Sequence, residues 1–90
     1  PAAEMVRQIE QDTFIVAMVE SAGGVAAASD IAAVAGIDAV IIGANDLAAD
    51  MGHLGAVDHP EVLAAFAAVA AATRAQGKIF GVIGVGAALL

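Results

Sequence analysis

Two acidic residues stand where a parallel α/β fold places its ligands. Glu20 directly follows the apolar run at residues 14–19, and Asp46 follows a second apolar run, residues 38–42, after a short turn-prone segment. Because ligands bind outside the carboxyl ends of parallel strands, we expect the two side chains to be neighbours. Two carboxylates with open positions left over suit Mg²⁺ or Mn²⁺. The alternative is that Glu20 caps the next helix and Asp46 makes a local turn.

Three apolar runs alternate with helical stretches and predict the elements that position these carboxylates. The runs are continuous and partly β-branched, which is typical of strands covered on both faces in a parallel sheet. The predicted strands are residues 14–19, 38–42 and 79–83. The predicted helices are residues 2–11, residues 25–34 with a break and new N-cap at Ser29-Asp30, and a helix from Pro60 to about Lys78. This alternation indicates right-handed parallel crossovers.

The segment between the second strand and the last helix is predicted to be irregular. Residues 43–46 are turn-prone, and a polar loop containing glycines is expected over residues 47–59. Pro60 fits the first position of a helix and Glu61 fits its positive first turn. The stripe at i, i+4 and i+7 that would face the core consists of Val62, Phe66 and Val69.

The composition points to an interior piece of a larger protein. Of the 90 residues, 61% are hydrophobic and 14% charged, and the mean hydropathy is +0.91, so apolar side chains exceed the roughly half expected of a soluble domain. Cysteine is absent, which excludes disulfides, thiolate nucleophiles and zinc-thiolate sites. The apolar runs at residues 62–72 and 79–90 are shorter than the roughly 20 residues that span a membrane. With no secretory signal visible, we expect a cytoplasmic protein without a membrane partner.

The remaining charged and imidazole side chains receive structural assignments. A formal net charge of −7 with three permanent cations argues against nucleic acid as a partner. Arg74 and Lys78 are expected to complement the end of the last helix, and Arg7 to pair on the surface of the first one. His53 and His59 are expected to be solvated loop histidines rather than catalytic groups.

Three segments of the sequence resemble the HpcH/HpaI aldolase family. They are Val-Ala-Met-Val-Glu-Ser-Ala-Gly-Gly-Val at residues 16–25, Gly-Ile-Asp-Ala-Val-Ile-Ile-Gly-Ala-Asn-Asp-Leu-Ala-Ala-Asp-Met-Gly-His-Leu-Gly at residues 36–55 and His-Pro-Glu-Val at residues 59–62. The resemblance implies an α/β fold in which residues 1–90 form one partial (β/α)₈ TIM-barrel domain, about strands five to seven of the barrel. A whole barrel usually takes around 250 residues, so a fragment is expected.

The resemblance also implies a chemistry. Glu20 and Asp46 would bind a divalent cation, Mg²⁺ or Mn²⁺ or else Co²⁺. The carboxylate of a 2-oxo acid such as pyruvate would lie against the segment formed by Gly43, Ala44, Asn45 and Asp46, held by backbone N–H groups. The implied enzyme is a class II aldolase that cleaves or forms 4-hydroxy-2-oxo acids or 2-dehydro-3-deoxy sugar acids, with an aldehyde as the second partner. The family's proton-transfer His and carboxylate-binding Arg lie upstream, so no catalytic residue and no activity are expected in this chain alone.

Two alternatives to the aldolase remain from the sequence. One is a fragment of an enzyme like the citrate lyase β-subunit or malyl-CoA lyase, which acts on acyl-CoA thioesters, although the Met-Gly-His-Leu-Gly loop at residues 51–55 favours the first group. The other is a non-catalytic assembly module that covers exposed apolar surface. Open strand edges predict a self-associated chain in either case, consistent with an expected homo-oligomer.

Overall fold

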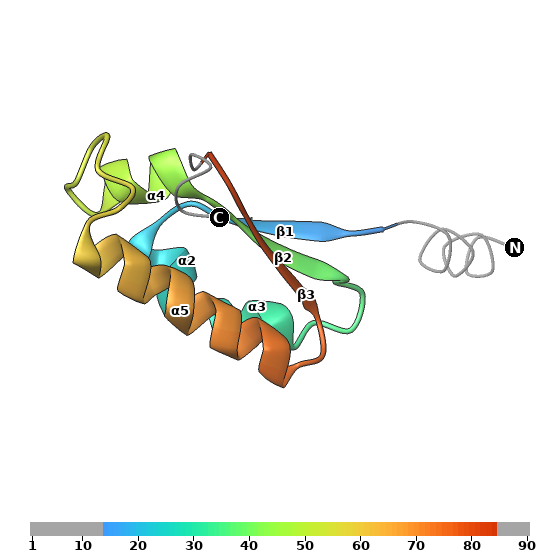
Figure 1. Ribbon diagram of the computed structural model, residues 1–90. Helices are drawn as coiled ribbons and strands as arrows, with labels where there is room; N and C mark the ends of the chain where they lie inside the picture. Colours follow the sequence, from blue (N-terminus) through green and yellow to red (C-terminus); the bar gives the residue numbers. More distant parts are fainter. Residues whose placement is uncertain (1–13, 85–90) are drawn as a thin grey trace, which may run out of the picture.

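The computed structural model describes residues 14–84, which form a three-stranded parallel sheet with helices (Figure 1). The strands lie in the order β1-β2-β3 and have the bounds Val16–Val19, Ala39–Gly43 and Ile79–Ile83. The prediction of three parallel strands with intervening helices is therefore confirmed. The helix predicted at residues 2–11, with Arg7, lies outside the described residues.

The strand register places the ends of β1 and β2 level with each other. Val19 at the end of β1 pairs with Ile42, so the next residue, Glu20, comes beside Gly43 at the end of β2. Gly43 in turn pairs with Ile83 at the end of β3. All three strands thus end along one edge of the sheet, which is where the sequence predicts the functional residues.

Two short helices follow β1 in place of the single interrupted helix predicted from the sequence. They are α2, Ala22–Ala26, and α3, Ala28–Ala32. The break falls at Ala27, so the prediction of a new N-cap at Ser29-Asp30 is wrong. The helical segment begins early because the Ser21 hydroxyl accepts the backbone N–H of Gly24 at 3.1 Å, which satisfies one of the free donors of the first turn.

Helix α4, Ala44–Asp50, replaces the turn and the first part of the loop predicted after β2. Its buried residues, Ala44, Leu47 and Ala48, have the i, i+3, i+4 spacing of a helix face. Burial of this face selects the helix, and the predicted turn at residues 43–46 is therefore wrong. The irregular loop is limited to residues 51–59, where Gly52 and Gly55 have φ angles of +84° and +78°.

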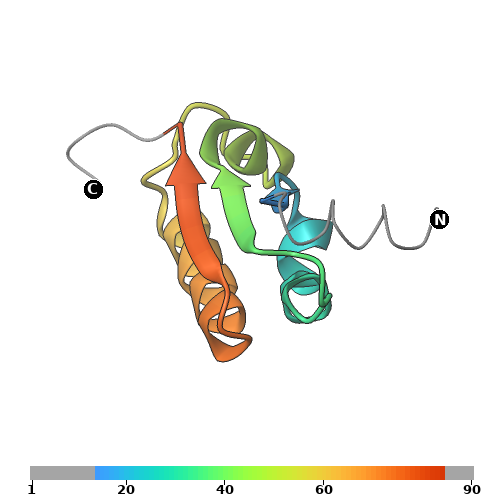
Figure 2. The same ribbon diagram turned by 90° about the vertical axis from the view of Figure 1, so that its right-hand side faces the viewer.

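Helices α2, α3 and α5, Pro60–Ala75, lie on one face of the sheet, and Figure 2 shows α5 packed along β2 and β3. Val40 and Ile42 point toward this layer and are fully buried, whereas the alternate positions of the strands lie on the other face. That open face exposes Val16, Met18, Ile79 and Ile83. The strands were predicted to be covered on both faces. Within residues 14–84 only the face toward the helices is covered.

Helix α5 follows the sequence prediction closely. Pro60 occupies its first turn, the predicted positions Val62 and Val69 are fully buried, and Phe66 is partly buried against the core. Thr73, also buried, donates its hydroxyl to the carbonyl of Val69 at 2.7 Å. Within residues 14–84, none of the helices combines the length and apolar character needed to cross a bilayer.

Candidate functional site

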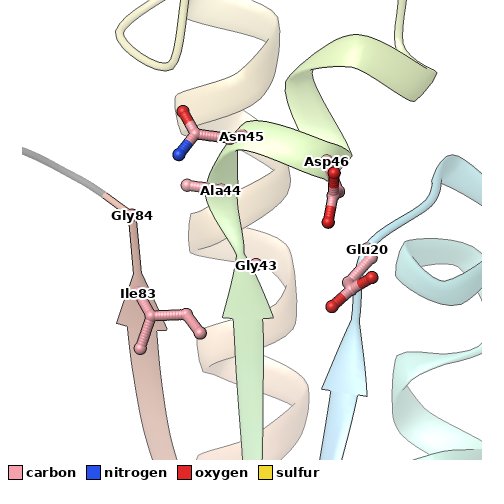
Figure 3. Close-up of a pocket in the computed structure, with 7 residues that line it drawn as sticks. All are labelled: Glu20, Gly43, Ala44, Asn45, Asp46, Ile83 and Gly84. Atoms are coloured by element: carbon pink, nitrogen blue, oxygen red, sulfur yellow. The ribbon is translucent and has the colours of Figure 1, made fainter.

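A cavity of about 150 Å³ lies at the carboxyl ends of the strands, beside the start of α4 (Figure 3). Its lining comes from the ends of all three strands and from the first turn of α4. The lining residues are Glu20, Gly43, Ala44, Asn45, Asp46, Ile83 and Gly84. Every residue that the sequence assigns to the substrate or metal site is in this set, so the structure brings the predicted site residues together.

The carboxyl groups of Glu20 and Asp46 face one another at the ends of β1 and β2 (Figure 3). Ser21, rather than Glu20, caps α2, so the capping alternative for Glu20 is wrong. Asp46 lies in the first turn of α4 rather than in an isolated turn, and the helix dipole favours its negative charge there. Among residues 14–84, neither carboxylate takes part in a side-chain hydrogen bond or an ion pair. Both groups therefore keep their oxygen lone pairs for an external partner.

Gly43 creates the space in which the Glu20 side chain lies. A Cβ placed on Gly43 would be 3.0 Å from Glu20 Cγ and 3.1 Å from Glu20 Oε1, closer than ordinary van der Waals contact. The missing side chain lets Glu20 reach across the end of β2 toward Asp46. Two exposed carboxylates that converge on a hollow suit a hard divalent cation such as Mg²⁺ or Mn²⁺.

We expect Gly43→Ala to weaken Mn²⁺ binding, because the added methyl group displaces Glu20. The expected loss of affinity is roughly tenfold, the lower range found when groups that orient metal ligands are altered. Titration followed by the electron paramagnetic resonance of free Mn²⁺ measures it. Gly36→Ala is the matched control, since a Cβ there meets nothing within 4 Å. Equal affinities in the two variants would show that the Glu20 position does not depend on Gly43.

Asp50 connects the two halves of the site, a role that the sequence does not suggest. Its Oδ2 accepts the backbone N–H of Ala22 at 2.7 Å, a contact across 28 residues of sequence. Asp50 lies one helical turn beyond Asp46 on α4, and Ala22 lies two residues beyond Glu20. Asp46 and Asp50 are four residues apart, so a prediction of helix α4 would have placed both on one face of that helix.

Gly84 forms the third side of the cavity and was also not singled out from the sequence. It has a φ angle of +88°, and a Cβ on it would lie 2.8 Å from Asn45 Nδ2. This close approach lets the end of β3 pack against the Asn45 side chain, which points toward the Gly84 side of the cavity, whereas Asp46 lies on the Glu20 side (Figure 3). The strand-end rule that identifies Glu20 and Asp46 would find Gly84 when applied to the third strand.

His53 and His59 lie in the loop and at its end as expected, but they are partly buried and hydrogen-bonded rather than fully solvated. Both are partly buried, and their rings stack with centroids 3.6 Å apart. His53 Nε2 donates to Glu61 Oε2 at 3.0 Å, and His59 is the N-cap of α5, its Nδ1 accepting the Glu61 backbone N–H at 3.1 Å. The hydrogen bond from His53 is the main reason that the pKa of Glu61 lies below its ordinary value. None of the three residues lines the strand-end cavity.

The basic residues Arg74 and Lys78 lie at the other end of the strands. Lys78 immediately precedes β3, and its Nζ donates to the carbonyl oxygens of Val34 and Ile37 at 2.9 and 2.5 Å. Arg74 is in the last turn of α5, with its guanidinium carbon 6.0 Å from the centre of the Phe80 ring. Arg74 thus lies in the last turn of α5 as expected, whereas Lys78 donates to carbonyl groups after α3 rather than to the end of α5. Neither residue lines the cavity.

Comparisons with known proteins give the same family along most of the chain. The profile of the HpcH/HpaI aldolase/citrate lyase family matches residues 2–88. A hydroxypyruvate/pyruvate aldolase of Delftia acidovorans is 40% identical over 80 residues, which cover 89% of this chain and 30% of the relative. A 5-keto-4-deoxy-D-glucarate aldolase of Klebsiella pneumoniae is 40% identical over 76 residues, or 84% of this chain and 30% of the relative.

The structural comparison agrees with the sequence comparison. The crystal structure of an HpcH/HpaI aldolase from Desulfitobacterium hafniense superposes with a TM-score of 0.83 and 36% identity, covering 99% of this chain and 35% of that one. The chain thus spans about a third of the length of these relatives, and its parallel strands and helices form part of a TIM-barrel fold. By sequence profile, identity and fold, the chain belongs to the HpcH/HpaI aldolase/citrate lyase family.

Proposed function

We propose that this chain is the metal-binding part of a divalent-metal-dependent class II aldolase. The reaction is the cleavage or formation of 4-hydroxy-2-oxo acids or 2-dehydro-3-deoxy sugar acids, with pyruvate as product or nucleophile. The observation that carries the proposal is the pair Glu20 and Asp46, which face one another in a cavity at the strand ends without a side-chain partner within residues 14–84. Aldolases among the relatives support the reaction class.

Glu20 and Asp46 are the residues that would hold the cation. Their carboxylates supply hard oxygen ligands and leave further positions for water and substrate oxygens, which suits Mg²⁺, Mn²⁺ or Co²⁺. When bound, the cation supplies Lewis acidity that stabilises negative charge on the oxygens of a 2-oxo acid. Their two negative charges also attract a cation, and no Lys or Arg from residues 14–84 lines the cavity.

The first turn of α4 is proposed to bind the substrate carboxylate. The first N–H groups of a helix have no acceptor within it, and Asn45 and Asp46, in the first turn of α4, line the cavity. Gly43 and Ala44 are small, so a ligand can approach the backbone closely. Ile83 adds an apolar wall on the β3 side. We place this chain at about strands five to seven of the barrel. The proton-transfer group is proposed to come from other strands of the barrel, which are not part of this chain.

Two other functions are distinguishable by experiment. An enzyme like citrate lyase or malyl-CoA lyase fits the same family name, but it requires an acyl-CoA thioester as substrate. An assembly module is favoured by the open sheet face, where Val16, Met18, Ile79 and Ile83 are exposed. Aldol chemistry with a free 2-oxo acid supports the first proposal over both.

A segment exchange with the Delftia aldolase tests the proposal. The part of that enzyme that aligns with this chain is replaced by the residues of this chain, because the relative then supplies the rest of the barrel. We expect the chimera to consume pyruvate in aldol addition to an aldehyde only with Mg²⁺ or Mn²⁺ present. The same chimera carrying Glu20→Gln should lose at least about a hundredfold in rate, because a metal ligand is removed.

The chimera is checked for folding by circular dichroism and for oligomeric state by chromatography before activity is compared. A folded chimera without metal-dependent aldol activity would contradict the proposal. Activity with an acyl-CoA thioester but not with the free acid would instead favour the lyase alternative. Equal activity of the chimera with and without Glu20→Gln would show that Glu20 is not a metal ligand.

A further inference from the structure

A second cluster of ligand atoms lies in the loop at residues 51–59 and the first turn of α5. His53, His59 and Glu61 each offer one ligand atom, and these atoms lie within 4.8 Å of one another. The imidazole rings stack with planes 12° apart, and His53 Nε2 lies 3.0 Å from Glu61 Oε2. The cluster shares no residue with the lining of the strand-end cavity and is therefore a distinct set of ligand atoms.

The spacing of His53 and Glu61 matches that of two ligands on one ion. Bonds of about 2.0–2.2 Å from nitrogen and oxygen to Zn²⁺ place neighbouring ligand atoms roughly 3.0–3.5 Å apart. The observed separation is 3.0 Å. A carboxylate only accepts hydrogen bonds, so His53 Nε2 carries a proton in the metal-free state. A cation can take the place of that proton between the two atoms without moving either residue far.

His59 can bind the same ion once its imidazole ring has rotated. Its Nδ1 now accepts the Glu61 backbone N–H, and its plane is nearly parallel to that of His53. A metal lies in the plane of each imidazole that binds it, so the stack must open by rotation of one side chain. His53 and His59 are both only partly buried, which leaves room for this rotation.

The ligand types select a different metal from that of the strand-end cavity. Two imidazoles and one carboxylate favour Zn²⁺, Ni²⁺ or Cu²⁺, whereas carboxylates alone favour Mg²⁺ and Mn²⁺. Glu61 is an exposed carboxylate, which is ionised at neutral pH in the ordinary way. No Lys or Arg belongs to the cluster, and the formal net charge of −7 attracts cations to the chain.

We propose that His53, His59 and Glu61 form a binding site for a borderline transition-metal ion such as Zn²⁺. The remaining coordination positions are open to water because Glu61 is exposed. The ion joins the loop that follows α4 to the first turn of α5. Its role is therefore to fix this loop rather than to take part in the chemistry of the Glu20 and Asp46 cavity.

Zinc titration of the full chain by calorimetry, together with Cu²⁺ electron paramagnetic resonance, tests the site. We expect one Zn²⁺ per chain at this site and nitrogen hyperfine structure in the Cu²⁺ spectrum. His53→Ala should weaken Zn²⁺ binding by roughly tenfold or more and remove part of the nitrogen coupling. His59→Ser should do the same, and its hydroxyl can still cap α5, so loss of the helix start does not confuse the result.

Asp58→Asn is the matched control, since it removes an exposed negative charge from the same loop without removing a member of the cluster. Its Zn²⁺ affinity should stay within about twofold of the parent, because an exposed charge that does not bind the ion acts on it only weakly through water. Zn²⁺ affinities equal to the parent in folded His53→Ala and His59→Ser would overturn the proposal. Mn²⁺ binding is measured in the same variants and should not change. If Glu20 and Asp46 prove not to bind Mn²⁺, the result for Zn²⁺ binding by the cluster therefore still stands.

Discussion

Glu20→Gln is expected to weaken Mn²⁺ binding to the chain by roughly a hundredfold, and Asp46→Asn by a similar factor. Each substitution keeps the size of the side chain and removes one of the two carboxylates that face one another in the cavity. Affinity for hard cations depends on the number of charged oxygen ligands. Even substitution of residues that only orient the ligands lowers metal affinity tenfold or more. Electron paramagnetic resonance of free Mn²⁺ gives the dissociation constants.

Asp30→Asn provides the charge control for this experiment. Asp30 is an exposed acid in the first turn of α3, away from the cavity. It should change Mn²⁺ affinity by less than about twofold, since a distant surface charge is largely screened. Affinities that fall equally in all three variants would mean that Mn²⁺ responds to overall charge, and the assignment of Glu20 and Asp46 as ligands would then be wrong.

The double variant distinguishes one shared ion from two separate ones. If Glu20 and Asp46 hold the same cation, removal of the second ligand acts on a site that is already damaged, and the two losses do not add. If each carboxylate binds its own ion, the losses are independent and one Mn²⁺ remains in each single variant. We expect one Mn²⁺ per chain at this cavity in the parent, and a loss of affinity in the double variant that is smaller than the two single losses combined.

Leu47→Ala is expected to lower the free energy of unfolding by about 2–5 kcal/mol, the range for truncation of a buried leucine. Leu47 is 0% exposed and packs in the core cluster with the sheet and α5. For a small domain with a total stability of about 5–15 kcal/mol, this loss is large. Urea denaturation followed by circular dichroism measures it.

Leu54→Ala is the matched comparison, because it is the same substitution seven positions along the chain. Leu54 is 84% exposed in the loop at residues 51–59, so its truncation should change the free energy of unfolding by less than about 0.5 kcal/mol. The sequence alone places both leucines in one polar loop and predicts similar small effects. Similar values for the two variants would thus contradict the buried position of α4.

The parallel sheet and the position of the site were predictable because two simple patterns agree. Continuous apolar runs identify the strands, and the rule that ligands bind at their carboxyl ends identifies Glu20 and Asp46. The strand register in the structure then places Glu20 beside Gly43. The role of the two carboxylates as metal ligands stays a prediction until metal binding is measured.

Helix α4 was missed for a physical reason. Gly43 and the polar pair Asn45 and Asp46 favour a turn locally, and the helix is too short for a clear periodic pattern. Burial of Leu47 and Ala48 outweighs those local preferences, and this burial depends on the finished sheet. Similarly, the pairing of His53 with Glu61 depends on the path of the intervening loop, which no local residue preference determines.

The hydrogen bond between Asp50 and the Ala22 amide has a consequence for motion. It couples the helix that carries Asp46 to the backbone just after Glu20, so a displacement of either strand-to-helix junction draws the other along. We therefore expect the two junctions to move together, so that the gap between the carboxylates changes less than the position of either one. The link lies before the loop at residues 51–59, so a change in the length of that loop would leave it in place.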